Sequence, residues 1–499
     1  MLKISHHFLS IFQLKFIKLN NFNNILYLKF KFLNMSGNSD TPSTDVALVR
    51  GNSSSEALIK GFDHLGAVDN FIQKNDLVFI KISFTQPFGY PANLNYDTLG
   101  KLIDLCREAG AKKVYVGDFV DVHINSESLT DTTGLSSFLE SKGAKFAYLD
   151  NTEEFPHRKI SLNDKQVQIP ALILDADKLI ILNQVNVHPL FILTLSYLNL
   201  FTIFPNKYQK IEKYERPGKD YLHLDQYKQD LISNILALSA IRHPNLVIND
   251  LFNVMEGAGP LIYKDSRCKQ TNLLIMGNDL FSVDYVTLKV MGVELTESKL
   301  LLEAQDHQSG RYNPETVSVV GESILDSQLK IQRCVSKLED INVKNCFMQA
   351  GRYCSGCFEK AYHFLNFLKS NMTKDLKYMG YFSFLIGEAP SEPDIKDEII
   401  LFGDCAMRST MDRDFRKITI QKQQKNTKKI MQKLKKSQKT PSKTSKKKVV
   451  KNKRILELPG CPPDLNQSYK TLIRYYGKKT VPNLKLLDLI NTGLIDKEK

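Results

Sequence analysis

The sequence predicts an α/β protein in which a domain with a largely parallel sheet precedes a smaller α/β domain that carries most of the cysteines. Apolar bursts alternate with amphipathic stretches from about Asp45 to Leu329, as strands and helices do around a parallel sheet. Three further bursts follow beyond residue 380, and two of them lead directly into cysteine motifs. With 499 residues and 42% hydrophobic content, the chain is long enough for two or three domains with cores.

The first predicted domain spans residues 45–330. An amphipathic helix is expected at Thr98–Ala109, with Leu99, Leu102 and Cys106 on its apolar face. The expected buried strands of this domain are Leu77–Ile82, Lys113–Val116, Phe146–Leu149, Leu179–Leu182, Leu246–Ile248 and Leu273–Met276.

The second predicted domain comprises residues 331–410 and 455–499. An amphipathic helix is expected around Ile331–Ile341, where the two domains separate, and another helical pattern begins just after Cys357. The expected strands are Tyr381–Ile386, Ile399–Phe402 and Ile455–Leu458, and a helix containing Leu472, Ile473 and Tyr476 follows the last of them.

Basic charge is concentrated in two segments. The formal net charge is +14, but residues 416–454 contain 17 Lys and Arg with no acid, and the first 34 residues contain five Lys with no acid. Removing these 22 charges leaves −8, so the rest of the chain is mildly acidic. Nucleic-acid binding is therefore not expected of the folded domains, and only the Lys-rich insertion could provide it.

Residues 411–454 are predicted to form a disordered insertion in the second domain. Gln, Lys, Ser and Thr dominate Gln421–Lys448, which cannot bury enough apolar surface to fold. Three interpretations stay open: an arm for nucleic acid or an acidic partner, a nuclear signal around Lys446–Lys448, or a low-complexity insertion without a function of its own. Because loop-closure entropy grows only logarithmically with length, such an insertion is tolerable.

Residues 1–44 are predicted to be a disordered or non-native extension. Met1–Asn34 is rich in Phe, Leu, Asn and Lys but lacks Arg, which a transit peptide would normally carry. This composition favours initiation at Met35, with organellar targeting as the alternative. No run of about 18 apolar residues occurs, so no membrane span is expected and the predicted compartment is the cytoplasm.

Polar side chains follow several predicted strands of the first domain. Asp118, His188, Asp250 and Glu256 are candidate substrate-site residues, because ligands of parallel sheets collect outside the carboxyl ends of the strands. The structural alternative for each is a helix cap or a turn, and His188 is followed by a proline.

Short motifs occur in order along this domain. They are Lys112–Asp118 after a helix, His188, Leu198–Phe201, Asp250 with Met255–Pro260, Gly277–Asp279, Val283–Asp284 and Met291–Gly292. In these motifs the chain resembles the family called domain of unknown function 362, over about 290 residues. It departs from the family where Asn186 and Leu198 replace lysines and Thr202 replaces a glycine. The resemblance implies the fold and a loose link to iron–sulfur proteins, but no reaction.

Four of the eight cysteines form a candidate metal site, since eight are too few for a disulfide scaffold in a chain of this size. Cys354 and Cys357 form a Cys-x-x-Cys knuckle before a helix, whose amino terminus favours the thiolate. Cys405 and Cys461 follow two predicted strands, each preceded by a glycine that lets the backbone turn closely. If those strands are parallel neighbours, the four sulfurs converge at one sheet edge.

The candidate metal group is a 4Fe-4S cluster, with zinc or unligated structural cysteines as alternatives. Zinc ribbons usually pair two knuckles, whereas this chain has one knuckle and two single cysteines. A proline follows Cys461, as is common at the last ligand of a cluster. Gly403–Ala406 and Pro459–Pro463 also resemble segments of the cluster-binding subunit of respiratory complex I and of the small subunit of nickel–iron hydrogenase, a likeness confined to short stretches that implies a cluster.

Three of the remaining cysteines are not expected among the four metal ligands, although one of them could replace a ligand. Cys106 and Cys334 lie on predicted helix faces and are expected in the core, whereas Cys346 could replace a ligand or be inert. Nucleotide-binding glycine motifs and a nucleophile elbow are absent from the sequence. Two function classes result: an iron–sulfur redox protein or oxidoreductase component with an unidentified redox partner or small-molecule substrate, and a non-catalytic protein with a structural zinc and a basic partner-binding arm.

Overall fold

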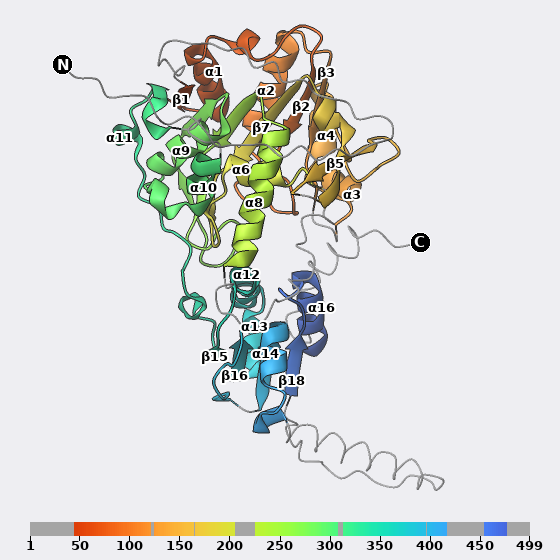
Figure 1. Cartoon of the computed structure of the whole chain (residues 1–499), viewed down its shortest axis with the longest axis vertical. Helices are drawn as coiled ribbons and strands as arrows, with labels where there is room; N and C mark the ends of the chain where they lie inside the picture. The colour runs from red at the N-terminus through yellow and green to blue at the C-terminus, as the bar shows by residue number, and fades with distance from the viewer. Residues whose placement is uncertain are drawn as a thin grey trace, which may run out of the picture. The chain divides into compact units, whose positions relative to one another are not determined.

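The computed structural model describes residues 44–120, 124–163, 165–204, 225–307, 313–395, 397–416 and 454–476 (Figure 1). All of them belong to one unit, Ser43–Lys499, which contains two mostly or wholly parallel sheets. The extension before residue 44 and most of the Lys-rich insertion, residues 417–453, lie outside the described residues. Within the described part of the chain, no helix is both long and apolar enough to cross a membrane.

The larger sheet, sheet A, has the strand order β14-β1-β13-β10-β7-β2-β3-β4. Only β13 runs antiparallel to its neighbours, so the predicted largely parallel sheet is confirmed. Its strands are β1 (Thr44–Arg50), β2 (Leu77–Lys81), β3 (Lys113–Gly117), β4 (Lys145–Phe146), β7 (Lys178–Gln184), β10 (Leu246–Asp250), β13 (Leu273–Gly277) and β14 (Val317–Gly321).

Alternating side chains of sheet A pack into two cores, one on each face. Along β1, Val46 and Leu48 belong to one core while Ala47 and Val49 belong to the other. The second core is covered by α1 (Ser54–His64), α2 (Tyr96–Glu108), α3 (Ser126–Thr133) and α4 (Leu135–Ser141). The first is covered by α6 (Ser196–Phe201), α8 (Gln226–Ile241), α9 (Leu280–Val290) and α10 (Lys299–His307).

Three antiparallel hairpins and two short helices complete the larger domain. Two of the hairpins, β8–β9 and β11–β12, follow the carboxyl ends of β7 and β10 and carry candidate site residues. The elements are β5 (His157–Leu162), β6 (Lys165–Pro170), α5 (Ala171–Asp175), β8 (Val187–His188), β9 (Ile192–Leu193), β11 (Asn253–Glu256), β12 (Arg267–Gln270) and α11 (Ile324–Ser327).

The smaller sheet, sheet E, has four parallel strands in sequential order. They are β15 (Cys346–Ala350), β16 (Phe382–Ile386), β17 (Glu398–Phe402) and β18 (Arg454–Leu458). Helices α12 (Ser355–Asn371) and α16 (Leu465–Tyr476) pack with Phe384 and Phe402 on one face, and α13 (Thr373–Met379) and α14 (Gly403–Ser409) complete the domain. The predicted second, smaller α/β arrangement is confirmed, and its sheet contains one strand, β15, that the sequence pattern missed.

Two predicted elements differ from the structure. The expected strand Phe146–Leu149 is the two-residue strand β4. The helix expected around Ile331–Ile341 is wrong, since the structure has only a 3-10 turn at Leu338–Ile341. The reason is a tertiary contact with the larger domain: the backbone N–H of Gln332 donates to the side-chain Oε2 of Glu256 at 3.0 Å, and its backbone O accepts from Gly257 N at 2.7 Å.

Candidate functional site

The cysteine knuckle lies between β15 and α12. Cys354 is the N-cap residue of α12 and follows β15 by only a few residues. Cys357 lies in the first turn of the helix and is buried. Both cysteines were predicted to precede the helix; Cys354 does so, whereas Cys357 lies inside the first turn. The knuckle also follows a strand, as the two other cysteine segments do.

Cys405 and Cys461 occupy turns at the carboxyl ends of β17 and β18. Cys405 is buried in α14, which begins directly after β17. Asp404 ties the two turns together: its backbone N–H donates to Gly460 O at 3.0 Å, and its Oδ1 accepts from Gly460 N at 2.7 Å. Both preceding glycines, Gly403 and Gly460, have positive φ angles of 86° and 129°. The close backbone turns predicted at these glycines are present.

The four thiols gather at the carboxyl edge of sheet E. A Cβ at Gly403 would stand 3.5 Å from Cys357 Sγ, so this sulfur lies against the turn that carries Cys405. A hydrogen bond with the Cys357 thiol lowers the pKa of Cys354 to about 6. That bond, burial and the nearby charges of the other three thiols raise the pKa of Cys357. The hydrogen bond therefore favours the thiolate form of Cys354 over that of Cys357.

The donor set fits a four-thiolate group in residue type, and the cysteine segments lie at one edge of the same sheet. As the side chains stand, however, no three or more His, Cys, Asp or Glu in the described segments form a group that could hold a metal ion. All eight cysteines lie in the described segments, and none of them forms a disulfide. The identity of any bound group stays a prediction.

The other cysteines lie away from this edge. Cys106 is buried in the core under α2, as expected, and burial raises its pKa to about 12. Cys346 is the first residue of β15, which puts it roughly 13 Å along the strand from the carboxyl edge. It is therefore badly placed to replace one of the four thiols. Cys334 is half-buried, not on a helix, and its Sγ contacts Gly259 O at 3.5 Å.

The knuckle packs directly on the larger domain. A Cβ at Gly356 would stand only 2.9 Å from the ring of Tyr227 in α8, so a glycine is needed between the two cysteines. Ser355 Oγ accepts from Lys228 N at 3.2 Å, and Tyr227 donates to Glu359 at 3.4 Å. The two residues between the cysteines, together with Glu359, thus take part in the contact between α8 and α12.

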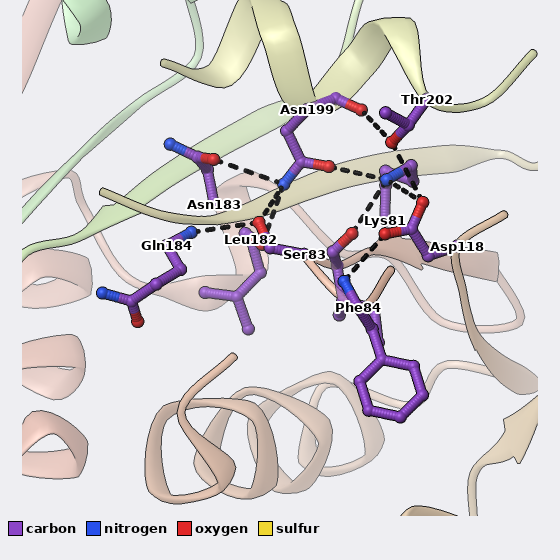
Figure 2. A network of polar contacts seen from close by, with 10 residues as sticks. Lys81, Ser83, Phe84, Asp118, Leu182, Asn183, Gln184, Asn199 and Thr202 are labelled. Carbon is purple, nitrogen blue, oxygen red and sulfur yellow. Dashed lines mark hydrogen bonds and ion pairs between the residues drawn. The ribbon is translucent and has the colours of Figure 1, made fainter. Parts of the chain in front are cut away.

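The carboxyl edge of sheet A is built around a buried ion pair between Lys81 and Asp118 (Figure 2). Lys81 Nζ lies 2.7 Å from Asp118 Oδ1 and donates to Asn199 Oδ1 at 2.6 Å and to Ile82 O at 2.8 Å. Asp118 also accepts from Phe84 N at 2.8 Å and from Thr202 Oγ1 at 3.0 Å. Removal from water lowers the pKa of Lys81 and raises that of Asp118, while their attraction opposes both shifts.

Asp250 is buried in a second polar cluster at the same edge. It accepts hydrogen bonds from Thr98 Oγ1 and from Phe252 N, the latter at 2.8 Å. Burial raises the pKa of Asp250 to about 6. Strands β7 and β2 separate β10 from β3, so about 14 Å of sheet lies between Asp250 and Asp118. The two carboxylates do not share a site.

His188 and Glu256 have structural partners in the hairpins. His188 Nδ1 accepts from Leu190 N at 3.1 Å and Phe191 N at 3.2 Å, which closes the β8–β9 turn and leaves the ring proton on Nε2. Burial lowers the pKa of His188 to about 4, so the ring is neutral at pH 7. Glu256 accepts from Gln332 N. His188 therefore has the role in a turn that was one of its two interpretations. A ligand role for His188 or Glu256 stays a prediction.

Comparison with known proteins identifies the larger domain. Residues 78–289 match the family model described as Domain of unknown function (DUF362). We call this region, which the family model matches over less than half of the chain, the DUF362 domain. The structure is also similar to that of the lactate racemase apoprotein from Thermoanaerobacterium thermosaccharolyticum, with 12% sequence identity, a TM-score of 0.32, and coverage of 70% of this chain and 71% of that one. No curated protein matches the chain.

The motif residues of the DUF362 domain meet in its polar interior. Asp284 accepts from Ser196 N at 3.0 Å and Tyr197 N at 3.1 Å, which caps the start of α6. The same helix carries Asn199, which reaches Lys81. Thr202, which stands where the family has glycine, adds a hydrogen bond to Asp118. The motifs therefore hold α6 against the carboxyl edge of sheet A.

Sequence reasoning missed Lys81 and Asp404. Lys81 ends an apolar strand and is followed by Ile82, and a lysine inside an apolar run is a usable indication that it is buried and paired. Asp404 lies between the predicted glycine and cysteine of its motif. Nothing in the pattern indicates that it bonds to a turn more than 50 residues away, because that contact depends on the order of β17 and β18.

Proposed function

We propose that Cys354, Cys357, Cys405 and Cys461 hold a 4Fe-4S cluster and that the protein is an electron-transfer protein or oxidoreductase component. The observation that carries this proposal is that three of the four parallel strands of sheet E end at these thiols. Four thiolates are the usual ligands of such clusters. When bound, the cluster would supply one-electron transfer.

The chain's own residues would shape this site. Gly403 and Gly460 let the two turns approach closely, and Asp404 fixes them to each other. The burial of Cys357 and Cys405 keeps water from part of the site. Because the knuckle contacts α8, a bound cluster would lie beside the DUF362 domain.

Zinc is the alternative occupant of the same four thiols. The packing of Gly356 on Tyr227 favours this alternative, since a structural metal there would stabilise the contact between α8 and α12. The protein would then be non-catalytic, and the Lys-rich insertion would be its partner-binding arm.

Anaerobic purification followed by metal and sulfide analysis tests the proposal. We expect a brown protein with broad visible absorbance, iron and acid-labile sulfide, and Cys461→Ser should lose all three. Cys346→Ser is the matched control and should retain them, because Cys346 lies at the opposite end of β15. A colourless protein with stoichiometric zinc would establish the alternative, and an unchanged spectrum of Cys461→Ser would remove that residue from the ligand set.

A further inference from the structure

A cavity of about 270 Å³ lies where three segments meet. The β11–β12 connection, which includes Gly257 and Ala258, contributes one wall, residues 332–341 a second, and Tyr362 and Asn366 of α12 the third. It is separate from the thiols and from the Lys81–Asp118 pair, since none of those residues lines it.

Hydrogen bonds between the walls hold the cavity in shape. Gly257 N donates to Gln332 O at 2.7 Å, Tyr362 donates to Gly259 O at 3.2 Å, and Lys264 N donates to Ser370 Oγ at 2.7 Å. Gly257 has a φ of 81°, and a Cβ there would stand 2.6 Å from Asp265 O. A side chain at this position would therefore be both strained and crowded. The walls are tied to one another without a ligand, as in most small-molecule sites.

Among the residues that the structure describes, two cations at the cavity have no ion-pair partner. Of the charged residues in its walls, Asp265 pairs with Lys369 and Arg333 pairs with Glu297. Lys264 and Arg267 form no ion pair within the described residues. The carboxylate of Asp340 also lines the cavity, and it too has no ion pair there. The unpaired groups are thus two cations and one anion.

We propose that this cavity binds a small polar molecule that carries a phosphate or carboxylate group. Arg267 and Lys264 would bind the oxyanion, because guanidinium and ammonium groups form charge-assisted hydrogen bonds with phosphate and carboxylate oxygens. Asp340 would accept from a hydroxyl or amine of the same molecule. The volume lies just below the usual range of ligand sites, which excludes a molecule as large as a dinucleotide.

Calorimetric titration of the full chain with inorganic phosphate, and separately with citrate, tests this proposal. We expect saturable binding of at least one probe, weakened tenfold or more in Lys264→Gln/Arg267→Gln. The matched control is Lys112→Gln/Lys113→Gln, which removes two positive charges from another cavity, at the amino ends of β2 and β3. This control should bind as the wild type does, and the probe that binds more tightly identifies the oxyanion.

Two results would overturn the proposal. One is the absence of binding of both probes to the wild-type chain. The other is equal weakening in the site variant and the control variant, which would show that the probes respond to total charge, including that of the Lys-rich insertion. All four substituted residues are surface cations, so unfolding curves should confirm that both variants fold.

Discussion

The two sheets of this protein use their carboxyl edges differently. At the edge of sheet A, Asp118 and Asp250 are buried, and groups of the same domain complete their hydrogen bonds. At the edge of sheet E the side chains are thiols, which hydrogen-bond weakly and bind metals well. The position after a parallel strand is the same in both cases. Whether it becomes a ligand site depends on whether the fold itself satisfies the side chain there.

Substitution of the buried lysine is the strongest test of the structural role of sheet A. Lys81→Met should lower the free energy of unfolding by about 3–5 kcal/mol, because it leaves the Asp118 carboxylate buried without its cation. Chemical denaturation measures the change. Any iron bound per folded chain should stay constant, since Lys81 does not contact the cysteine edge.

An exposed ion pair provides the control for this experiment. Arg158 and Asp175 are about half exposed, so Arg158→Met should change the free energy of unfolding by less than about 1 kcal/mol. The double variant Lys81→Met/Asp118→Asn should recover part of the loss. If Lys81→Met were as mild as Arg158→Met, the ion pair would not be what anchors this edge.

The pKa of Asp250 predicts an unusual pH dependence of stability. Burial raises its pKa from 3.8 to about 6, so between pH 4 and 6 the folded state keeps a proton that the unfolded state has released. Stability should therefore fall as pH rises through this window, by about 2–3 kcal/mol for this group. Asp250→Asn keeps a side chain of the same shape and should remove that part of the slope.

Denaturation of wild type and Asp250→Asn at several pH values measures the difference. Asp284 also has a pKa raised to about 6 by burial, so the variant should retain the part of the slope that belongs to Asp284. A stability difference that stays constant from pH 4 to 6 would mean that Asp250 is ionised in the folded protein throughout, and that its site is more polar than its burial indicates.

Most of the fold could be predicted because buried strands appear in the sequence as short runs of apolar residues. The apolar runs at β2, β3, β7 and β10 were located to within two residues, since both faces of a parallel sheet are covered. The direction of β13 could not be predicted, because an antiparallel strand buried on both faces has the same apolar pattern. Strand β15, partly exposed at the edge of sheet E, has no comparable run.

The residues of the candidate site could be predicted from the sequence, but their contacts with the rest of the protein could not. The cysteine spacing and the glycines predict that the thiols meet at one edge of a sheet. The parallel strands of sheet E bring the cysteine segments to the same carboxyl edge. The packing of Gly356 on Tyr227 depends on how α12 meets α8, which no local pattern encodes. For the same reason, the helix expected at Ile331–Ile341 is displaced by hydrogen bonds from Gln332 to the DUF362 domain.

Two glycines, Gly403 and Gly134, give the test with the smallest expected change in stability and the most selective effect on the cysteine edge. Gly403 and Gly134 both have positive φ, 86° and 73°, so alanine at either position should cost about 1–2 kcal/mol of backbone strain. The surroundings differ: no atom of the described residues lies within 4 Å of a Cβ at Gly134, whereas a Cβ at Gly403 would be in van der Waals contact, at 3.5 Å, with the sulfur of the proposed ligand Cys357. Only Gly403→Ala should therefore lower the iron content per chain, measured after anaerobic purification. Equal iron in both variants would mean that the space beside Gly403 is not needed by a bound group, and the carboxyl edge of sheet E would then be a structural edge like that of sheet A.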